Sequence, residues 1–482
     1  MFCVGRLATL AVLLLVSGCY SLKQRRELAA PQAGDCAEDS SPDRCSFRLH
    51  ELPGRSPYTL GVVEFDDQGL TYPVAQLGPF LEGLDQDNED YEGRLVLVFA
   101  HGWFHDARPD DTNLKFFSEM LEQFAAAETN AVAAGVQKKP RRVVGVFLAW
   151  RGAAWMTPGL EYLTFWSRKD AAHRIGERQV TDALLQIRQA AYRNASTDHA
   201  PNRFVIMGHS FGAALIYSAT SQLLTNSLLT SPETGVAPLA DAIILLNAAF
   251  EAARVHPLLA QALHDGHDRP VVTFLTAKND RATGWMFPFA RWINNVFGSF
   301  RDVKNPIRAE EISQRSANAR TIGHFSPFLT HDMTVVKSAE RSAPDPDTVR
   351  LQSKKASPET RADTHRKATQ QIGKAQQAYR DASAMTFGQT RLTPRSGLTS
   401  EHLSVFNVAV PSEIWSKHGL EQDGERRKYL MSFLMYYIPF TAAGPRLDLH
   451  EQARDRSPRA VPAAAPAAAP APALAPAPAT RF

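Results

Sequence analysis

The pattern in this chain that points most directly to chemistry is a serine between two glycines. Apolar residues 204–207 run into the sequence GHSFG, in which Ser210 stands between Gly208 and Gly212, and a helix-forming run follows at once. The glycines remove side chains that would collide with a tight strand-to-helix turn, and the serine hydroxyl is left exposed at its apex. Backbone N–H groups at the start of the helix can stabilise an oxyanion there. Ser210 is therefore a candidate nucleophile; the alternative is a glycine-rich turn without chemistry.

The sequence around this serine resembles the α/β-hydrolase superfamily. The turn GHSFG is similar to the nucleophile turn of esterases and lipases, and acid and histidine candidates follow it in that family's order. The resemblance covers residues 58–333 and about 400–442. It implies an α/β fold of the hydrolase type, with a mostly parallel sheet covered by helices on both faces, and a hydrolase that uses no cofactor.

A second turn resembles the family's oxyanion-hole turn. His101-Gly102-Trp103 follows the apolar run 94–100, and in the family the residue after this glycine supplies a backbone N–H. By this resemblance, the oxyanion donors are the backbone N–H groups of Trp103 and Phe211. Loss of one such donor typically lowers the rate by about 10²–10³-fold. The side chain of His101 has a plainer interpretation as a turn histidine bonded to its own loop.

The candidate acid is Asp280. A serine hydroxyl needs a histidine to accept its proton and a carboxylate to orient that histidine. Asp280 follows the apolar run 271–276, so it lies at the carboxyl end of an expected strand. Glu251, just after the run 242–247, is the alternative acid. A surface ion pair is the non-catalytic interpretation of Asp280.

The candidate base is His418. It lies in the loop between an expected strand, 403–410, and an expected closing helix, 425–438, where the hydrolase fold presents its histidine. His324 and His331 are the alternatives because they also follow Asp280 in the sequence. Neither has a clear strand before it, which favours His418.

Alternating strands and helices position these residues. Near-continuous apolar runs predict buried parallel strands, and the segments between them predict covering helices. An aromatic run follows the expected strand 143–150 and contains Trp155, Tyr162, Phe165 and Trp166. It could form a lid or an acyl-binding wall; the alternative is that these rings pack a helix onto the core. The expected strands are 94–100, 143–150, 242–247, 271–276 and 403–410, and the expected helices are 113–134, 170–192 and 425–438.

Two segments depart from this pattern. Residues 334–400 are rich in Lys, Arg, Ser, Asp and Gln and poor in apolar residues, which predicts a charged insertion that is largely disordered or partly helical. Residues 443–482 form an Ala/Pro-rich tail, extended and stiff, that we interpret as a passive spacer. The expected domains are a signal peptide 1–18, a linker 19–57, a hydrolase core 58–333, the insertion 334–400, the last strand, histidine loop and closing helix 401–442, and the tail.

The N-terminus has the pattern of a lipoprotein signal. Arg6 precedes the apolar run 7–16, which is too short to span a bilayer. The sequence from Val16 to Cys19 resembles the lipobox of bacterial lipoproteins, which implies lipidation of Cys19. Tyr20 favours the outer membrane under that resemblance, so we expect an envelope protein that faces the periplasm. An ordinary secretory signal is the alternative.

Composition and the remaining cysteines narrow the possible partners. The chain has 482 residues, 44% of them hydrophobic, and a formal net charge of +3 with scattered basic residues, so no nucleic-acid partner is expected. Cys36 and Cys45 lie in a segment expected to be exported, which favours a disulfide between them over two free thiols. Neither has a metal-ligand partner at suitable spacing, and no metal site is predicted.

Two functions of different classes follow. The first is an envelope-anchored serine hydrolase that cleaves a small-molecule or lipid carboxylic ester through Ser210, Asp280 and His418 and an acyl-enzyme. Thioesters and amides use the same machinery. The second is a catalytically inactive hydrolase-fold lipoprotein that acts as a binding or envelope-interaction module. Its support is the charged insertion and the Ala/Pro-rich tail, neither of which catalysis requires.

Overall fold

The computed structural model of the chain describes residues 47–51, 53, 55–71, 77–85, 89–152, 164–193, 202–229, 239–262, 269–288, 298–336, 356–400 and 402–442. They belong to one compact unit, Met1–Pro445, and a second unit, Arg446–Phe482, is not among them. The predicted signal peptide, Cys19, the Cys36–Cys45 pair, Trp155, Tyr162 and the Ala/Pro-rich tail lie outside the described residues.

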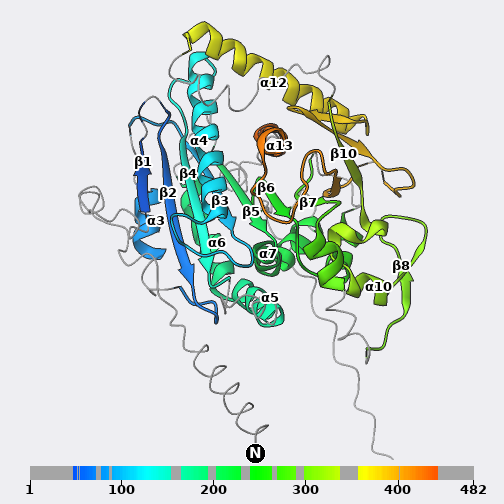
Figure 1. Cartoon of the computed structure of the whole chain (residues 1–482). Helices are drawn as coiled ribbons and strands as arrows, with labels where there is room; N and C mark the ends of the chain where they lie inside the picture. Colours follow the sequence, from blue (N-terminus) through cyan, green and yellow to red (C-terminus); the bar gives the residue numbers. More distant parts are fainter. Residues whose placement is uncertain are drawn as a thin grey trace, which may run out of the picture. The chain divides into compact units, whose positions relative to one another are not determined.

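The architecture is an 11-stranded sheet with helices packed on it (Figure 1). The strand order is β1-β2-β4-β3-β5-β6-β7-β13-β10-β12-β11. Every neighbouring pair from β2 to β10 is parallel, whereas the pairs at the two edges are antiparallel. The expected α/β class with a mostly parallel sheet is therefore confirmed. The strands are β1 Phe47–His50, β2 Tyr58–Phe65, β3 Arg94–Ala100, β4 Arg142–Trp150, β5 Arg203–His209, β6 Ala242–Leu246, β7 Val272–Ala277, β10 His331–Val335, β11 Met385–Phe387, β12 Thr390–Pro394 and β13 Val405–Val410; a separate hairpin pairs β8 Asp302–Lys304 with β9 Glu311–Ser313.

The central strands form because their side chains are buried on both faces. Every residue of β3, β6, β7 and β13 is buried. A parallel strand covered on both faces can be apolar at successive positions, which is why these runs do not alternate with polar residues. The five strands expected from apolar runs are all present, with ends shifted by two residues or fewer.

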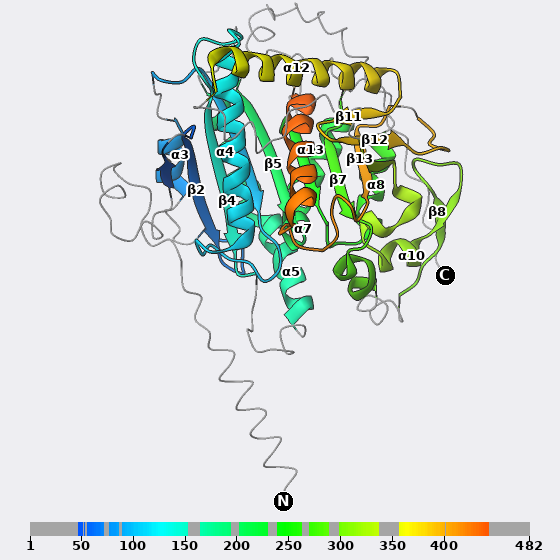
Figure 2. The same cartoon turned by 45° about the horizontal axis from the view of Figure 1, so that its top comes forward.

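Helices cover both faces of the sheet. The crossover through α4 leads from β3 to β4 in one direction, and those through α6 and α7 lead the opposite way, to β5 and β6. Because such crossovers are right-handed, α4 lies on one face and α6 and α7 on the other. Helix α13 contacts α4, and α12 crosses over both (Figure 2). The helices are α3 Leu77–Asp85, α4 Thr112–Ala133, α5 Phe165–Ile175, α6 Thr181–Tyr192, α7 Phe211–Leu229, α8 His256–Gln261, α10 Gln314–Ala319, α12 Pro358–Arg380 and α13 Gly424–Ala442.

The direction of the crossovers reverses between β3 and β5, which are neighbours in the sheet. Ligands of open α/β sheets bind at the carboxyl ends of the strands at such a reversal. The turn that starts at His101 follows β3, and Ser210 follows β5. The topology thus brings the two turns singled out in the sequence to one place.

The expected linker 19–57 contains a strand. Residues 47–50 form β1, which pairs antiparallel with β2. The Phe47 ring packs edge-on against Phe80 of α3, with ring centroids 5.4 Å apart. β1 could not be expected from the sequence, because four residues give too short a pattern to distinguish a strand from a linker.

Of the two alternatives for the insertion at 334–400, largely disordered or partly helical, the first is wrong for residues 356–400 and the second agrees with a helix there. These residues form α12 and then a hairpin of β11 and β12, and β12 pairs with β10 and extends the main sheet. Residues 337–355 are outside the described part. The helix begins in a regular way, because the Ser357 side chain accepts the N–H of Thr360 and Pro358 occupies the first turn.

Low apolar content misled this prediction because the few apolar residues stand at effective positions. In α12, Ala375 and Tyr379 are buried at helical spacing, and Ala368 and Ile372 on the same face pack against the core. In the hairpin, Met385, Phe387 and Leu392 are all 1% exposed or less.

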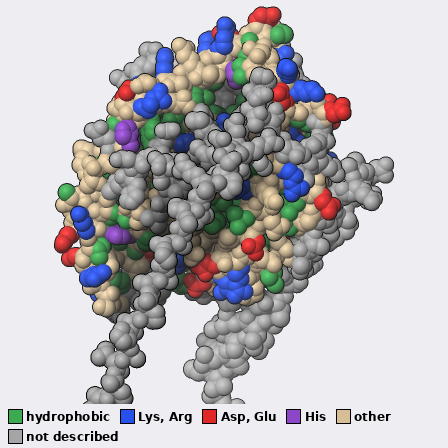
Figure 3. Space-filling model, turned by 180° about the vertical axis from the view of Figure 1, so that it is seen from behind, with side chains coloured by type: hydrophobic (Ala, Val, Ile, Leu, Met, Phe, Trp, Pro, Cys, Tyr) green, Lys and Arg blue, Asp and Glu red, His purple; other side chains and the backbone are tan. Residues whose placement is uncertain are grey.

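On the face seen in Figure 3, Lys and Arg side chains are interspersed with Asp and Glu over the described surface.

His331, an alternative base, opens β10 and is buried against the Phe406 ring, with ring centroids 4.1 Å apart. Its Nδ1 lies 2.9 Å from the Thr330 hydroxyl. Burial lowers the pKa of His331 to about 3, against a smaller opposing effect of Asp332. The imidazole is therefore neutral in the folded protein at neutral pH.

This buried histidine predicts a loss of stability in acid. Below pH 6.5 the unfolded chain binds a proton that folded His331 does not bind, so the free energy of unfolding decreases as the pH falls from 6.5 towards 3. At pH 5 this single group costs about 2 kcal/mol. In His331→Phe, which keeps an aromatic ring on Phe406, the decrease between pH 7.5 and 5 should be smaller by about that amount. Urea unfolding at both pH values measures it, and equal decreases in the two proteins would contradict the prediction.

Candidate active site

Ser210 stands in a strained turn between β5 and α7. Its φ of 56° lies in the left-handed region, which is uncommon for a residue with a side chain. A Cβ added at Gly208 would lie 2.6 Å from the Gly212 carbonyl oxygen, and one at Gly212 would lie 2.2 Å from the Ala100 carbonyl oxygen. Both glycines are therefore required by close backbone approaches. The second approach also packs this turn against the end of β3.

The structure brings Ser210, His418 and Asp280 together in one hydrogen-bonded chain. His418 Nε2 lies 2.6 Å from Ser210 Oγ, and His418 Nδ1 lies 2.7 Å from Asp280 Oδ2. Ser210 and Asp280 are buried, and the His418 side chain is 27% exposed. With a neutral imidazole, the Ser210 hydroxyl donates to Nε2 and Nδ1–H donates to the carboxylate, which is the arrangement that makes a serine nucleophilic.

Asp280 is held as a carboxylate by several donors. Oδ1 accepts the N–H of Ala282 at 2.9 Å and of Thr283 at 3.4 Å. Oδ2 accepts from His418 and also from the Thr283 hydroxyl. Burial alone would raise the pKa of Asp280, but the charge and hydrogen bond of His418, together with the Thr283 hydroxyl, outweigh it and lower the pKa. Asp280 is thus ionised at neutral pH and can stabilise an imidazolium.

The turn at residues 101–103 lies against the serine turn. A Cβ added at Gly102 would lie 2.9 Å from Ser210 Cβ, so Gly102 is needed for this approach. Trp103 follows Gly102, and Phe211 follows Ser210 as the first residue of α7. The backbone N–H groups predicted as oxyanion donors therefore belong to adjoining turns.

His101 orients the peptide between Gly102 and Trp103. The Trp150 N–H donates to His101 Nε2 at 3.0 Å, so the ring proton is on Nδ1, which donates to the Gly102 carbonyl at 3.0 Å. Burial lowers the pKa of His101 to about 4 and keeps the ring neutral. The carbonyl and N–H of a trans peptide point in opposite directions, so the Trp103 N–H points away from His101. This is the turn histidine bonded to its own loop.

Aromatic rings surround the two turns. The Phe165 ring lies 5.3 Å from Trp103, 5.1 Å from Phe211 and 6.1 Å from Phe287, measured between centroids. Phe211 and Phe287 are buried, whereas Trp103 and Phe165 are partly exposed. The described residues of the predicted aromatic run are Phe165 and Trp166, whose ring centroids lie 5.3 Å apart, and Phe165 packs on the residues next to the candidate oxyanion donors.

Two side chains that the sequence analysis missed hold the His418 backbone. The His418 carbonyl accepts from Asn247 Nδ2 at 2.8 Å and from His209 Nε2 at 2.8 Å. Since a carbonyl accepts only, His209 Nε2 donates this hydrogen bond. Burial holds the pKa of His209 well below its usual value. The sequence held one signal for each residue. His209 is the middle residue of the GHS turn, and Asn247 directly follows an apolar strand.

Asn247 joins three segments. It follows β6 with a φ of 44°, a conformation that asparagine tolerates. Its Oδ1 accepts the N–H of Ala277 at 2.9 Å, at the end of β7, while its Nδ2 reaches the His418 loop. The loop that presents the histidine is thereby tied to the carboxyl ends of β6 and β7.

The alternative acid, Glu251, is committed to other partners. Its carboxylate lies 2.9 Å from Lys169 Nζ and 3.2 Å from Arg254 Nε, and both Lys169 and Glu251 side chains are buried. The alternative base, His324, contacts Thr283 and not Ser210: its Nε2 lies 3.0 Å from Thr283 Oγ1. His331 is buried in the core beside Phe406. Of the candidate acids and bases, Asp280 and His418 are the pair linked to Ser210.

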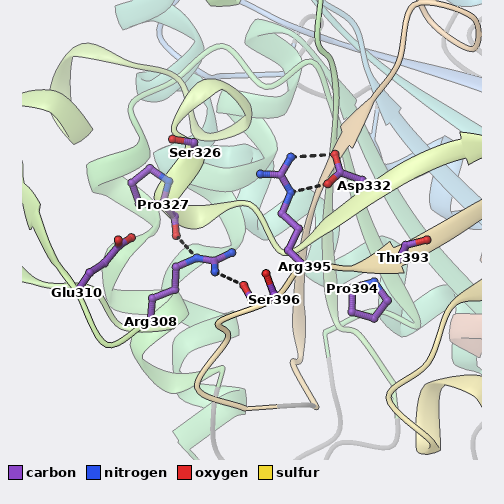
Figure 4. Close-up of a pocket in the computed structure, with 9 residues that line it drawn as sticks. All are labelled: Arg308, Glu310, Ser326, Pro327, Asp332, Thr393, Pro394, Arg395 and Ser396. Atoms are coloured by element: carbon purple, nitrogen blue, oxygen red, sulfur yellow. Dashed lines mark hydrogen bonds and ion pairs between the residues drawn. The ribbon is translucent and has the colours of Figure 1, made fainter.

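A polar pocket of about 580 Å³ lies elsewhere on the surface (Figure 4). Arg395 pairs with Asp332, and Arg308 donates to the carbonyl oxygens of Pro327, Ser396 and Leu329. The pocket is lined by none of the candidate catalytic residues. Its cations are thus engaged by groups of the protein itself.

The described residues contain neither a metal-binding cluster nor a helix able to span a membrane. Within these ranges no group of three or more His, Cys, Asp and Glu side chains is placed to hold a metal ion. None of the described helices combines the length and apolarity needed to cross a membrane.

The contacts of Asn247 predict that its side chain positions His418, and a glycine variant can test this without straining the backbone. Asn247→Gly removes the side chain, and glycine adopts the same φ freely. If the proposed base must be held by its loop, ester turnover should fall about tenfold or more with little change in KM, the size expected for a lost hydrogen bond in a preorganised site. Steady-state kinetics with a short-chain ester measure this, and an unchanged kcat in a folded variant would contradict it.

Comparison with protein-family models and with curated proteins gives no match to this chain.

Proposed function

We propose that the chain is a serine hydrolase of the α/β-hydrolase type and that it cleaves carboxylic esters. The observation that carries the proposal is the hydrogen-bonded chain from Ser210 through His418 to Asp280, with the serine at a strained turn. The topology also supports it: Ser210 follows β5, Asp280 follows β7 and His418 follows β13, so the order along the sequence is serine, acid, histidine.

In the proposed reaction, Ser210 Oγ attacks the ester carbonyl carbon while its proton passes to His418 Nε2. Asp280 stabilises the imidazolium and keeps its ring in place. The N–H groups of Trp103 and Phe211 would stabilise the negative oxygen of the tetrahedral intermediate. The intermediate then expels the alcohol, which takes the proton from His418. Water, activated in the same way, attacks the acyl-enzyme and releases the acid and free Ser210.

Esters with an apolar acyl part suit this site best. The rings of Trp103 and Phe165 adjoin the proposed oxyanion donors and are partly exposed, so they offer an apolar surface beside the reacting carbon. This surface supports a small-molecule or lipid ester as the substrate. The proposed cellular setting is the bacterial envelope, with lipid on Cys19 and the catalytic unit facing the periplasm.

The first test is covalent labelling with a fluorophosphonate probe. Wild-type protein should be labelled and Ser210→Ala should not, because the probe reacts with an activated serine hydroxyl. His418→Ala and Asp280→Asn should each lower ester turnover by about 10⁴-fold, since each removes part of the proton-transfer chain. A folded wild-type protein that resists labelling would favour a binding or envelope-interaction role for the same fold.

The proposed anchor has a separate test. Cys19→Ala removes the sulfur that would carry the lipid, so the variant should move from the membrane fraction to the soluble periplasmic fraction when cells are fractionated. Its ester turnover in solution should stay at the wild-type level. Membrane retention of the variant would contradict lipidation at Cys19.

A further inference from the structure

His324 is linked to the proposed catalytic acid even though it does not reach the nucleophile. Its Nε2 lies 3.0 Å from Thr283 Oγ1, and this hydroxyl in turn is hydrogen-bonded to Asp280 Oδ2. Oδ2 is also the oxygen that His418 Nδ1 contacts at 2.7 Å. One carboxylate oxygen thus lies between two histidines, one bound directly and one through a threonine.

The direction of each hydrogen bond follows from the chemistry of the groups. An ionised carboxylate only accepts, so the Thr283 hydroxyl donates its one proton to Asp280. The Thr283 oxygen then has lone pairs left with which to accept, and the group facing it is His324 Nε2. His324 must therefore carry a proton on Nε2. The chain runs from His324 to Thr283 to Asp280, and from Ser210 to His418 to the same Asp280 oxygen.

We propose that His324 and Thr283 are positioning residues for catalysis, and that His324 acts on Asp280 through the Thr283 hydroxyl. The inference rests on the proposed hydrolase function and extends it beyond the three catalytic residues. Without the second donor, Oδ2 would be held by His418 alone, and the carboxylate would fix the orientation of the ring that points Nε2 at Ser210 less firmly.

The surroundings hold this second donor in place. Thr283 is 1% exposed, and its own N–H also binds Asp280. The His324 ring lies close to the Gly284 backbone, where an added Cβ would be 3.1 Å from the ring. The backbone N–H of His324 donates to the Thr321 carbonyl at 3.1 Å, and the Thr321 hydroxyl donates to the Thr283 carbonyl at 3.3 Å. Both partners are thus fixed by backbone contacts.

Electrostatics favour a neutral donor at this position. Burial lowers the pKa of His324; Asp280 opposes this effect and His418 adds to it, and these two are the titratable groups that act on the ring. At neutral pH the ring therefore supplies an N–H without adding a positive charge near Asp280. A charge there would compete with His418 for the carboxylate.

The test uses isosteric pairs. Thr283→Val and His324→Phe keep the volume or the ring but remove the donor, whereas Thr283→Ser and His324→Gln keep a hydroxyl or an N–H. Thr276→Val is the matched control, because its buried hydroxyl has no hydrogen-bond partner among the described residues. For each folded variant, kcat and KM for a short-chain ester and the rate of fluorophosphonate labelling are measured, together with the downfield proton NMR signal of His418 Nδ1–H.

Thr283→Val should lower kcat and the labelling rate about 10- to 100-fold with KM nearly unchanged, as expected when one hydrogen bond to a charged group is lost. His324→Phe loses a hydrogen bond to the neutral Thr283 hydroxyl and should lower both by less, about 3- to 10-fold. Thr283→Ser and His324→Gln should recover most of the loss, and Thr276→Val should behave as wild type. The Thr283→Val, His324→Phe double variant should be no slower than Thr283→Val alone. The Nδ1–H signal should shift in both donor-removing variants.

Two failures are distinguishable. A folded wild-type protein that is not labelled overturns the hydrolase function itself. Normal labelling of wild type combined with unchanged rates in Thr283→Val or His324→Phe overturns the positioning role alone, as does an additive double variant or an unmoved Nδ1–H signal. The NMR signal does not depend on turnover, so it tests the connection to Asp280 in either case.

Discussion

The hydrogen bond between Asp280 and His418 is the contact on which the candidate site depends, and it joins residues 138 positions apart in the sequence. The sheet makes this contact possible. β7 and β13 are parallel neighbours, and Ala277 pairs with Val410 at their carboxyl ends. Asp280 leaves β7 three residues after this pair, and the His418 loop leaves β13 beside it. A change of register between these two strands would separate the acid from the base.

Polar groups buried near this contact satisfy one another. The His418 carbonyl has two donors, and the Asp280 carboxylate accepts from two side chains and two backbone N–H groups. An unpaired buried carbonyl or carboxylate would cost free energy and would favour another loop conformation. Each of these hydrogen bonds therefore stabilises the geometry of the site, because breaking it would leave a buried polar group unpaired. Rigid preorganisation of this kind is what an activated serine requires.

The sequence predicted the residues whose position follows from a single strand end. Ser210, Asp280 and the turn at 101–103 each follow an apolar run directly, and parallel strands bring their carboxyl ends to one edge. His418 follows its strand by eight residues, and its place could still be expected from the closing helix. Asn247, His209 and Thr283 were missed because their roles depend on a partner in another segment. Nothing local distinguishes an asparagine that binds a distant carbonyl from one that caps a turn.

The insertion shows the same limit for the fold. Its apolar residues are few, and whether they are buried depends on helices and strands elsewhere, so local composition favoured disorder over 356–400. In the structure these residues support the histidine-bearing segment. β10 pairs with β13, which leads to His418, and β12 covers the other edge of β10.

The insertion also contacts the closing helix, α13. The Gln389 N–H donates to the Ser432 hydroxyl of α13 at 3.2 Å, and the Gln371 side chain of α12 makes two hydrogen bonds to the Gly388 backbone. Tyr379 of α12 also packs on Phe406 of β13, with ring centroids 6.0 Å apart. The insertion therefore contacts both β13, which precedes the His418 loop, and α13, which follows it. This argues against an insertion that catalysis does not need. Deleting residues 356–400 would expose the edge of β10 and the part of α13 that α12 and β11 contact, and would remove packing from the elements on both sides of the loop that the Asp280–His418 contact requires.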